Sequence, residues 1–350
     1  MAVRIGFVGV GSMGQCAHLK NYVITPDCEV VALAEIRPEL ACKVAARYGV
    51  PRVYPTHGEL LAGEKLDGIV AAQPFTRHGT LIPELLKAGV PVFTEKPIAA
   101  AVEMGEKIVR AMKKARTWMM IGYHKRSDPA TMFAVKEIRR LKESGELGAM
   151  RYVRITMPPG DWIAGGFADL IRTDEKYPPL DEDPAPRGMD EATRKKYITF
   201  VNYYIHQVNL MRHLFGEDYK VVFAEKSGVL FVARSRSGIA GTIEMAPYNT
   251  SIDWQEAALV GFERGYVRID LPAPLAANRP GTVTIFKDLG KGTSPQTVIP
   301  QLPWVGAMRQ QAANFVAALR GRMEPLCTAE EALEDLKVAR DYIRLAGKSH

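Results

Sequence analysis

The stretch RIGFVGVGSMG, residues 4–14, decides the fold. Its first part, Arg4–Val8, is a short apolar run typical of a buried parallel strand. The strand leads directly into GVGSMG, which has the spacing G-x-G-x-x-G. Gly9 permits a tight turn, Gly11 lets the backbone approach a pyrophosphate, and Gly14 allows close helix–strand packing. With a helix expected over 15–24, the stretch predicts a dinucleotide-binding turn.

An acidic residue completes this unit. A second strand is expected over 29–34, and Glu35 closes it, 21 residues after Gly14. A carboxylate at this place accepts hydrogen bonds from the adenosine ribose hydroxyls and repels a 2′-phosphate. Glu35 therefore favours NAD. NADP stays as the alternative, because Arg37 lies two residues further on and can partly compensate the negative charge of a 2′-phosphate.

The tripeptide Glu95-Lys96-Pro97 ends another short apolar strand, in which Val92 and Phe93 lie. Ligands of open α/β sheets sit outside the carboxyl ends of the strands. A half-desolvated lysine at such an end can have a pKa low enough to exchange a proton near neutrality. The alternative interpretation is a surface lysine in a turn that the proline terminates.

Strands and helices alternate up to residue 122, which indicates a doubly wound parallel sheet. Here the pattern predicts helices over 38–48, 58–62, 78–88 and 102–115, and strands over 66–72 and 118–122. Beyond residue 123 we expect helices over 131–144, 202–215, 306–319 and 328–345. Between them lie strand-like runs at 150–157, 221–224, 229–233, 239–245, 257–261, 266–269 and 282–286. These runs are typical of an antiparallel sheet with one solvated or interface face.

The composition is that of an ordinary soluble globular protein, with 47% hydrophobic and 24% charged residues in 350. This length favours two domains, and no apolar run approaches the ~18 residues of a membrane span. The amino terminus lacks the basic region of a signal peptide, and the four cysteines show no paired spacing, which suits reduced thiols, so we expect a cytoplasmic protein. The net charge of +7 is spread along helices without a nucleic-acid motif, which argues against nucleic acid as a partner.

Residues 158–191 form a long stretch rich in proline and glycine, with nine acidic residues against three basic ones. Loops of this length inside a compact domain are usually functional lids or disordered. Trp162 in this stretch either covers a substrate or pins the loop. Other chemistries have little support. His206 and His213 are seven residues apart, too far for the i, i+4 pair of a zinc site, and no G-x-S-x-G elbow of a serine hydrolase occurs.

Several motifs together resemble the Gfo/Idh/MocA oxidoreductases, a family that includes inositol and glucose–fructose dehydrogenases. The resemblance covers essentially the whole chain and rests on Gly9–Gly14, Pro74 with His78, Glu95-Lys96-Pro97, Arg126 in GYHKRSDP, and His206 in a helix. It implies an NAD(P)-binding Rossmann domain, an α+β domain with an open-faced, mainly antiparallel sheet, and a carboxyl-terminal helix that returns to the Rossmann domain. It further implies hydride transfer at a ring carbon of a sugar or cyclic polyol, and a Lys96–Pro97 bond that is often cis.

Two motifs depart from the family pattern. Gln73-Pro74-Phe75 stands where the family commonly has T-P-N, which keeps the proline and changes the side chains near the cofactor. Asn202-x-x-x-His206 stands where the family usually has D-x-x-x-H. Asparagine cannot exchange a proton as a carboxylate does. We expect Asn202 and His206 on one face of one helix, with the histidine as proton partner of Lys96 and the amide orienting the substrate.

The motifs and the resemblance together give the candidate site, without a metal. The catalytic candidates are Lys96, His206 and Asn202, and the substrate contacts are Lys96, Arg126, Trp162, Asn202 and His206. The cofactor contacts are Gly9, Gly11, Ser12, Met13, Gly14, Glu35, Arg37, Gln73, Pro74, His78, Glu95, Lys96 and Pro97.

The predicted domains are a dinucleotide-binding Rossmann domain (1–122), a substrate-binding and oligomerisation domain (123–327) and the carboxyl-terminal helix (328–350). We expect a homodimer or homotetramer formed through the second sheet. Three functions remain open: a sugar or polyol dehydrogenase or ketoreductase, an NAD-dependent glycosidase or eliminating enzyme that oxidises the ring transiently, and a non-catalytic NAD-sensing protein. Dinucleotide binding alone needs neither Lys96 nor His206, which argues against the sensor.

Overall fold

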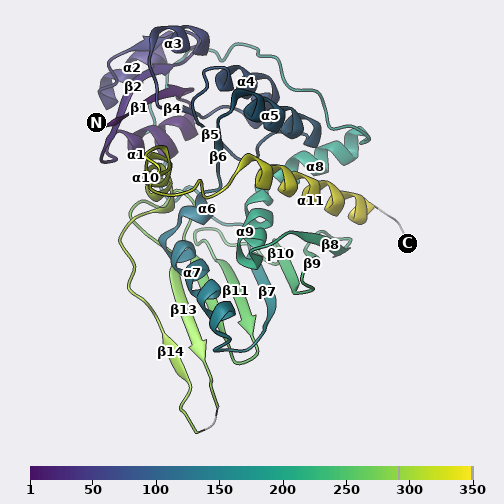
Figure 1. Cartoon of the computed structure of the whole chain (residues 1–350). Helices are drawn as coiled ribbons and strands as arrows, with labels where there is room; N and C mark the ends of the chain where they lie inside the picture. Colours follow the sequence, from purple (N-terminus) through teal and green to yellow (C-terminus); the bar gives the residue numbers. More distant parts are fainter. Residues whose placement is uncertain (291, 348–350) are drawn as a thin grey trace. The chain divides into compact units, whose positions relative to one another are not determined.

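The apolar runs before residue 123 form one six-stranded sheet with the order β3-β2-β1-β4-β5-β6 (Figure 1). Every neighbouring pair of strands is parallel. The strands are β1 (Val3–Val8), β2 (Cys28–Ala34), β3 (Val53–Tyr54), β4 (Gly68–Ala71), β5 (Val92–Glu95) and β6 (Met119–Gly122). This is the strand order of the dinucleotide-binding Rossmann fold, with its switch point between β1 and β4. The predicted doubly wound parallel sheet is therefore confirmed.

The computed structural model describes residues 1–290 and 292–347 and divides into two compact units. The first unit combines Met1–Tyr123 with Gly165–Arg194 and Met308–Leu336. The second combines His124–Ala164 with Lys195–Ala307 and the chain from Lys337 onward. Gly165–Arg194, expected in the second domain, thus groups with the Rossmann sheet. Residues 348–350 of the predicted carboxyl-terminal segment lie outside the described residues.

Helices connect the parallel strands. They are α2 (Pro38–Tyr48), α3 (His57–Gly63), the 3₁₀ turn η2 (Phe75–Arg77), α4 (His78–Leu86) and α5 (Val102–Ala115). Both α2 and α5 have the predicted bounds, and α2 ends where Gly49 takes a left-handed conformation, with φ at 67°. The helix expected over 15–24 is present and ends at Tyr22: the chain forms a π-helix, η1 (Gly14–Leu19), followed by the short α1 (Lys20–Tyr22). Such π-helical segments occur frequently at functional sites.

The last two helices, α10 (Ala307–Leu319) and α11 (Ala329–Gly347), close the chain. The first half of α11 lies against α5, where Gly105 leaves room for Leu333: a Cβ atom at Gly105 would lie 3.0 Å from the Leu333 Cδ1 atom. Across the described ranges, no helix combines the length and the apolar character needed to cross a membrane.

The second unit is built on an eight-stranded sheet with the order β14-β13-β12-β11-β7-β10-β9-β8. Its strands are β7 (Met150–Met157), β8 (Tyr219–Ala224), β9 (Leu230–Ser235), β10 (Ala240–Met245), β11 (Glu256–Phe262), β12 (Gly265–Leu271), β13 (Thr282–Lys287) and β14 (Gln296–Val298). All seven predicted strands are present, and β14 is additional. The pair β7–β10 is parallel and the other pairs are antiparallel. Helices α7 (Pro129–Ser144) and α9 (Ile205–Phe215) contact the sheet.

The single helix expected over 202–215 is wrong. The chain forms α8 (Glu191–Tyr203) and α9, separated at Tyr204. At the break, the Gln207 N–H donates to the Tyr204 carbonyl at 3.0 Å, an i to i+3 bond, and the Val208 N–H donates to the same carbonyl at 3.2 Å. Asn202 therefore lies in the last turn of α8 and His206 in the first turn of α9. The two residues thus belong to consecutive helices and not, as the sequence predicts, to one helix.

Phe93, in the strand that delivers the lysine motif, is the centre of the aromatic packing in the first unit. Its side chain is fully buried. Its ring lies 5.2 Å from the His18 ring, 6.4 Å from Tyr22 and 5.6 Å from Phe315, measured between centroids. Tilted and edge-to-face contacts of this kind stabilise a core beyond the area that they bury. Phe93 thereby joins β5, the helix after the glycine turn, and α10.

We predict that Phe93→Ala lowers the free energy of unfolding by ~3–5 kcal/mol, because it leaves a cavity among these rings. Denaturant titration monitored by circular dichroism measures the loss. Phe223→Ala is the matched control: Phe223 lies on β8 with 53% of its surface exposed, and its loss should change stability by less than ~1 kcal/mol. Equal effects of the two substitutions would contradict this description of the core.

Candidate functional site

The glycine turn at the end of β1 leaves room for a phosphate. Gly9 has φ at +91°, and a Cβ atom there would lie 2.2 Å from the Gln73 Nε2 atom, so a side chain does not fit. At Gly11 the situation is the opposite. Among the described residues, the nearest atom to a Cβ there, apart from its chain neighbours, is the Arg37 Nη2 atom at 3.9 Å. The space above Gly11 is therefore open, and Ser12 and Met13 lead from it to the start of η1 at Gly14.

The acid after β2 is bound to the glycine turn and to a cation. Glu35 is buried, and its Oε2 atom accepts a hydrogen bond of 3.1 Å from the Val10 N–H. Its Oε1 atom accepts from the Arg37 Nε atom at 2.8 Å, and Arg37 Nη2 donates to Oε2 at 3.1 Å. The hydrogen bond with Glu35 raises the pKa of Arg37 further. Glu35 and Arg37, which the sequence presents as competing determinants of cofactor choice, are thus a bidentate ion pair.

The lysine turn at the end of β5 is held from behind. The buried Glu95 carboxylate lies 2.7 Å from the His18 Nε2 atom and accepts the Lys96 N–H at 3.1 Å. Burial alone would raise the pKa of Glu95, but the bond with His18 and the charge of Lys96 lower it overall. Lys96 itself is half-buried, and the Lys96–Pro97 peptide bond is cis. The half-desolvated lysine that the motif predicts is therefore present.

His78 braces the same turn. Its ring is fully buried, with Nδ1 3.2 Å from the carbonyl oxygens of Pro97 and Ile98, and Nε2 3.1 Å from the Gln73 carbonyl. Burial lowers the pKa of His78, which keeps the ring neutral near pH 7. This placement gives His78 a positioning role beneath the turn. The side chain of Gln73 is half-buried, and Pro74 is exposed.

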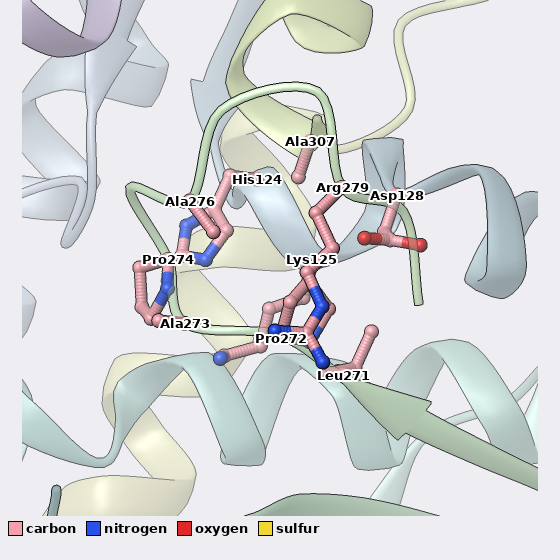
Figure 2. A pocket seen from close by; sticks show the side chains of 10 residues that line it. All are labelled: His124, Lys125, Asp128, Leu271, Pro272, Ala273, Pro274, Ala276, Arg279 and Ala307. Carbon is pink, nitrogen blue, oxygen red and sulfur yellow. The ribbon is translucent and has the colours of Figure 1, made fainter. Parts of the chain in front are cut away.

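The second unit contains a pocket at the start of the short helix α6 (His124–Ser127) (Figure 2). His124 and Lys125 line it from α6, and Arg279 reaches it from the loop between β12 and β13. Asp128 ties this loop to α7, because its carboxylate accepts from the Ala130 N–H at 2.8 Å and the Gly281 N–H at 3.0 Å. Burial raises the pKa of Asp128 to about 6.

Lys125 lines this pocket, whereas the sequence analysis names only Arg126 from the GYHKRSDP motif. Its ammonium group is bound to the buried Glu256 carboxylate and lies 5.6 Å from the centroid of the Trp254 ring. Gln207 donates to the same carboxylate at 2.7 Å, and the Trp254 Nε1 atom at 3.2 Å. The motif GYHKRSDP indicates this short helix but not which of its cations lines the pocket, because neighbouring residues of one helix turn point in different directions.

Arg126, the predicted substrate contact, requires a correction. Its side chain is almost fully buried, at 2% exposure, and its Nε atom donates to the Asn209 Oδ1 atom of α9 at 2.7 Å. It therefore holds α6 against α9. The other predicted residues of this unit are more accessible. His206 is half-buried, with its ring centroid 4.5 Å from that of His124, and Asn202 is exposed.

Trp162 contacts the loop between β12 and β13, which lines the pocket. Its carbonyl accepts the Leu275 N–H at 3.2 Å, and its side chain is 36% exposed. Because the backbone makes this bond, the two roles predicted for the Trp162 side chain stay predictions. In residues 1–290 and 292–347, no group of three His, Cys, Asp or Glu residues is placed to hold a metal ion.

Comparison with known proteins adds to this geometry. Residues 3–123 match the model of the Gfo/Idh/MocA oxidoreductase family with an NAD-binding Rossmann fold. The myo-inositol 2-dehydrogenase of Thermotoga maritima is 24% identical over 244 residues, which cover 70% of this chain and 63% of that protein. The inositol 2-dehydrogenase of Rhizobium meliloti is 23% identical over 354 residues, covering 98% of this chain and 97% of that protein. Residues 3–123 are therefore an NAD-binding Rossmann domain of the Gfo/Idh/MocA oxidoreductase family, and the similarity to inositol 2-dehydrogenases extends over the rest of the chain.

Within the solved structures, the WlbA dehydrogenase of Bordetella pertussis, in complex with NADH and UDP-GlcNAcA, has the same fold. The TM-score is 0.68 at 21% identity, over 99% of this chain and 95% of that one. The family match, the strand order and the open cradle at Gly11 agree on an oxidoreductase that uses NAD or NADP. The residues around the glycine turn therefore fit a dinucleotide.

We predict that Glu256→Gln lowers the free energy of unfolding by ~3–5 kcal/mol, because it leaves the Lys125 ammonium buried without a countercharge. The double variant Lys125→Met/Glu256→Gln should recover at least half of this loss, since it no longer leaves the Lys125 ammonium buried without its countercharge. Denaturant titration of the wild type and both variants measures it. A single variant within ~1 kcal/mol of the wild type would mean that solvent reaches Lys125 more freely than the structure shows.

Proposed function

We propose that this oxidoreductase transfers a hydride between the nicotinamide of NAD and a ring carbon of a sugar or cyclic polyol. The observation that carries the proposal is the half-buried Lys96 at the end of β5, in the sheet whose glycine turn leaves Gly11 open. The inositol 2-dehydrogenases among the relatives support the substrate class. Glu35 supports NAD over NADP, because it is the carboxylate that ribose hydroxyls need.

Each residue then has a role that its surroundings allow. The bound nicotinamide supplies the hydride acceptor or donor. Lys96 takes the hydroxyl proton when the alcohol is oxidised, and His206 exchanges it with solvent, since an imidazole titrates near neutrality. Asn202 orients the substrate by hydrogen bonds.

The cofactor residues keep the roles expected from the sequence. The dinucleotide lies along Gly9, Gly11, Ser12, Met13, Gly14, Glu35, Arg37, Gln73, Pro74, Glu95, Lys96 and Pro97, and His78 supports the turn from below. A cytoplasmic location, and a homodimer or homotetramer formed through the second sheet, stay predictions.

A substrate panel tests the proposal. Inositols, aldoses and nucleotide sugars are each incubated with NAD and with NADP, and the nicotinamide absorbance is followed. Net formation of NADH with a simple polyol or sugar supports a dehydrogenase. Cleavage of a glycoside without net NADH would favour the transiently oxidising glycosidase or eliminating enzyme. Tight NAD binding without turnover of any compound would favour the NAD-sensing protein.

We predict that Lys96→Ala lowers kcat by ~10²-fold or more, because the alanine side chain cannot accept the hydroxyl proton. The Kd for NADH, measured by fluorescence titration, should change much less. Lys96→Arg separates charge from proton transfer, since arginine stays protonated in proteins. It should be as slow as the alanine variant. Recovery of kcat by arginine would show that Lys96 acts as a fixed charge.

We also predict that His206→Ala lowers kcat by ~10²-fold while the melting temperature barely moves, because the ring is half-buried. His213→Ala is the matched control on the same helix. His213 is half-buried as well, and burial lowers its pKa well below the usual range, so its neutral ring cannot exchange the proton and its loss should spare kcat. A destabilised His206→Ala with normal kcat would make His206 a core residue, and Lys96 would then work with water.

A further inference from the structure

The acidic segment, Gly165–Arg194, lies on the elements of the first unit that carry the proposed cofactor site. Ile171 is bound to Gln15 of η1: its N–H donates to Oε1 at 3.1 Å, and its carbonyl accepts from Nε2 at 3.2 Å. Further along, the Asp183 carboxylate accepts the Gly79 N–H of α4 at 2.6 Å. The segment therefore runs past the helix starts at the carboxyl edge of the parallel sheet.

Between these two contacts, Glu175 covers the start of α2. Its Oε1 atom accepts the Glu39 N–H at 3.0 Å, and its Oε2 atom accepts the Leu40 N–H at 2.8 Å. Pro38 occupies the first position of this helix, so these are the first N–H groups that the helix offers to an anion. Partial desolvation opposes ionisation, but the two N–H groups and Arg37 lower the pKa of Glu175 overall, so it is a carboxylate at neutral pH.

Arg37 is engaged on two sides. It forms the bidentate pair with Glu35, and its guanidinium carbon lies 5.0 Å from the centroid of the Tyr177 ring of the acidic segment. Its side chain is only 18% exposed. Its Nη2 atom also lies 3.9 Å from the Cβ position of Gly11, so Arg37 is close both to the glycine turn and to Glu35, the acid expected to bind the ribose.

We propose that Glu175 is a second residue that selects NAD over NADP. A 2′-phosphate needs an arginine close to it and N–H groups that donate hydrogen bonds to its oxygens. Glu175 already holds the N–H groups of α2, and Glu35 already holds Arg37. A 2′-phosphate arriving there would meet two carboxylates, whereas a 2′-hydroxyl would meet only acceptors that suit it. The inference rests on the proposed use of NAD by this site.

The test compares Kd values of NADH and NADPH, measured by fluorescence titration, in the wild type and in Glu175→Gln. The amide keeps an oxygen for one N–H group and removes the charge. We expect the Kd of NADPH to fall ~10-fold, and that of NADH to change less than ~3-fold. Adding Arg37→Ala to Glu175→Gln should abolish the gain, because the phosphate then lacks its cation. If Glu175→Gln does not fold, Glu175→Ser serves in its place.

Asp183→Asn is the matched control, since Asp183 is a carboxylate of the same segment that covers a different helix. It should leave the ratio of the two Kd values unchanged. The proposal is overturned if Glu175→Gln leaves the ratio unchanged, or if both variants change it equally, which would mean that a loosened segment acts without discrimination. A wild type that binds neither dinucleotide would instead refute the proposed function.

Discussion

The buried contact between the Glu95 carboxylate and the His18 imidazole joins the two motifs on which the molecule depends. Glu95 ends the strand that leads to the lysine turn, and His18 lies in the π-helix that follows the glycine turn. A buried carboxylate is costly without a partner, so this contact of 2.7 Å specifies how strand and helix meet. It holds Lys96 and Gly11, far apart in the chain, to the same edge of one sheet.

The sequence predicts elements well where local pattern and tertiary packing agree. Helix α2 begins with a proline at its first position and ends at a left-handed glycine, and it has the expected bounds. Prediction fails where the pattern is weak or the cause is distant. All three residues of β14 are exposed, so no alternation marks the strand. The break at Tyr204 lies inside a continuous helical pattern, and no residue type in the sequence marks it.

In the candidate site, too, some features are predictable from the sequence and others depend on packing. Gly9 is recognisable because its backbone conformation and its contact with Gln73 demand glycine, and such demands are visible in a motif. Arg126 and Lys125 are adjacent cations in one short helix, and only the packing decides that Arg126 joins α9 while Lys125 lines the pocket. The ion pair of Glu35 with Arg37 also depends on the fold: the sequence suggests that one favours NAD and the other NADP, but in the structure they neutralise each other.

An acidic segment in a chain of net charge +7 shows that local fields, not net charge, act at such a site. Much of Gly165–Arg194 has no regular secondary structure, so its order depends on side chains that bind helix starts. Its carboxylates take the N–H groups of α2 and α4. At η1, by contrast, Met13 provides no side-chain cap, and the segment contributes a neutral contact through Ile171. Among these three helix starts, the one left for a phosphate is therefore the one at the glycine turn.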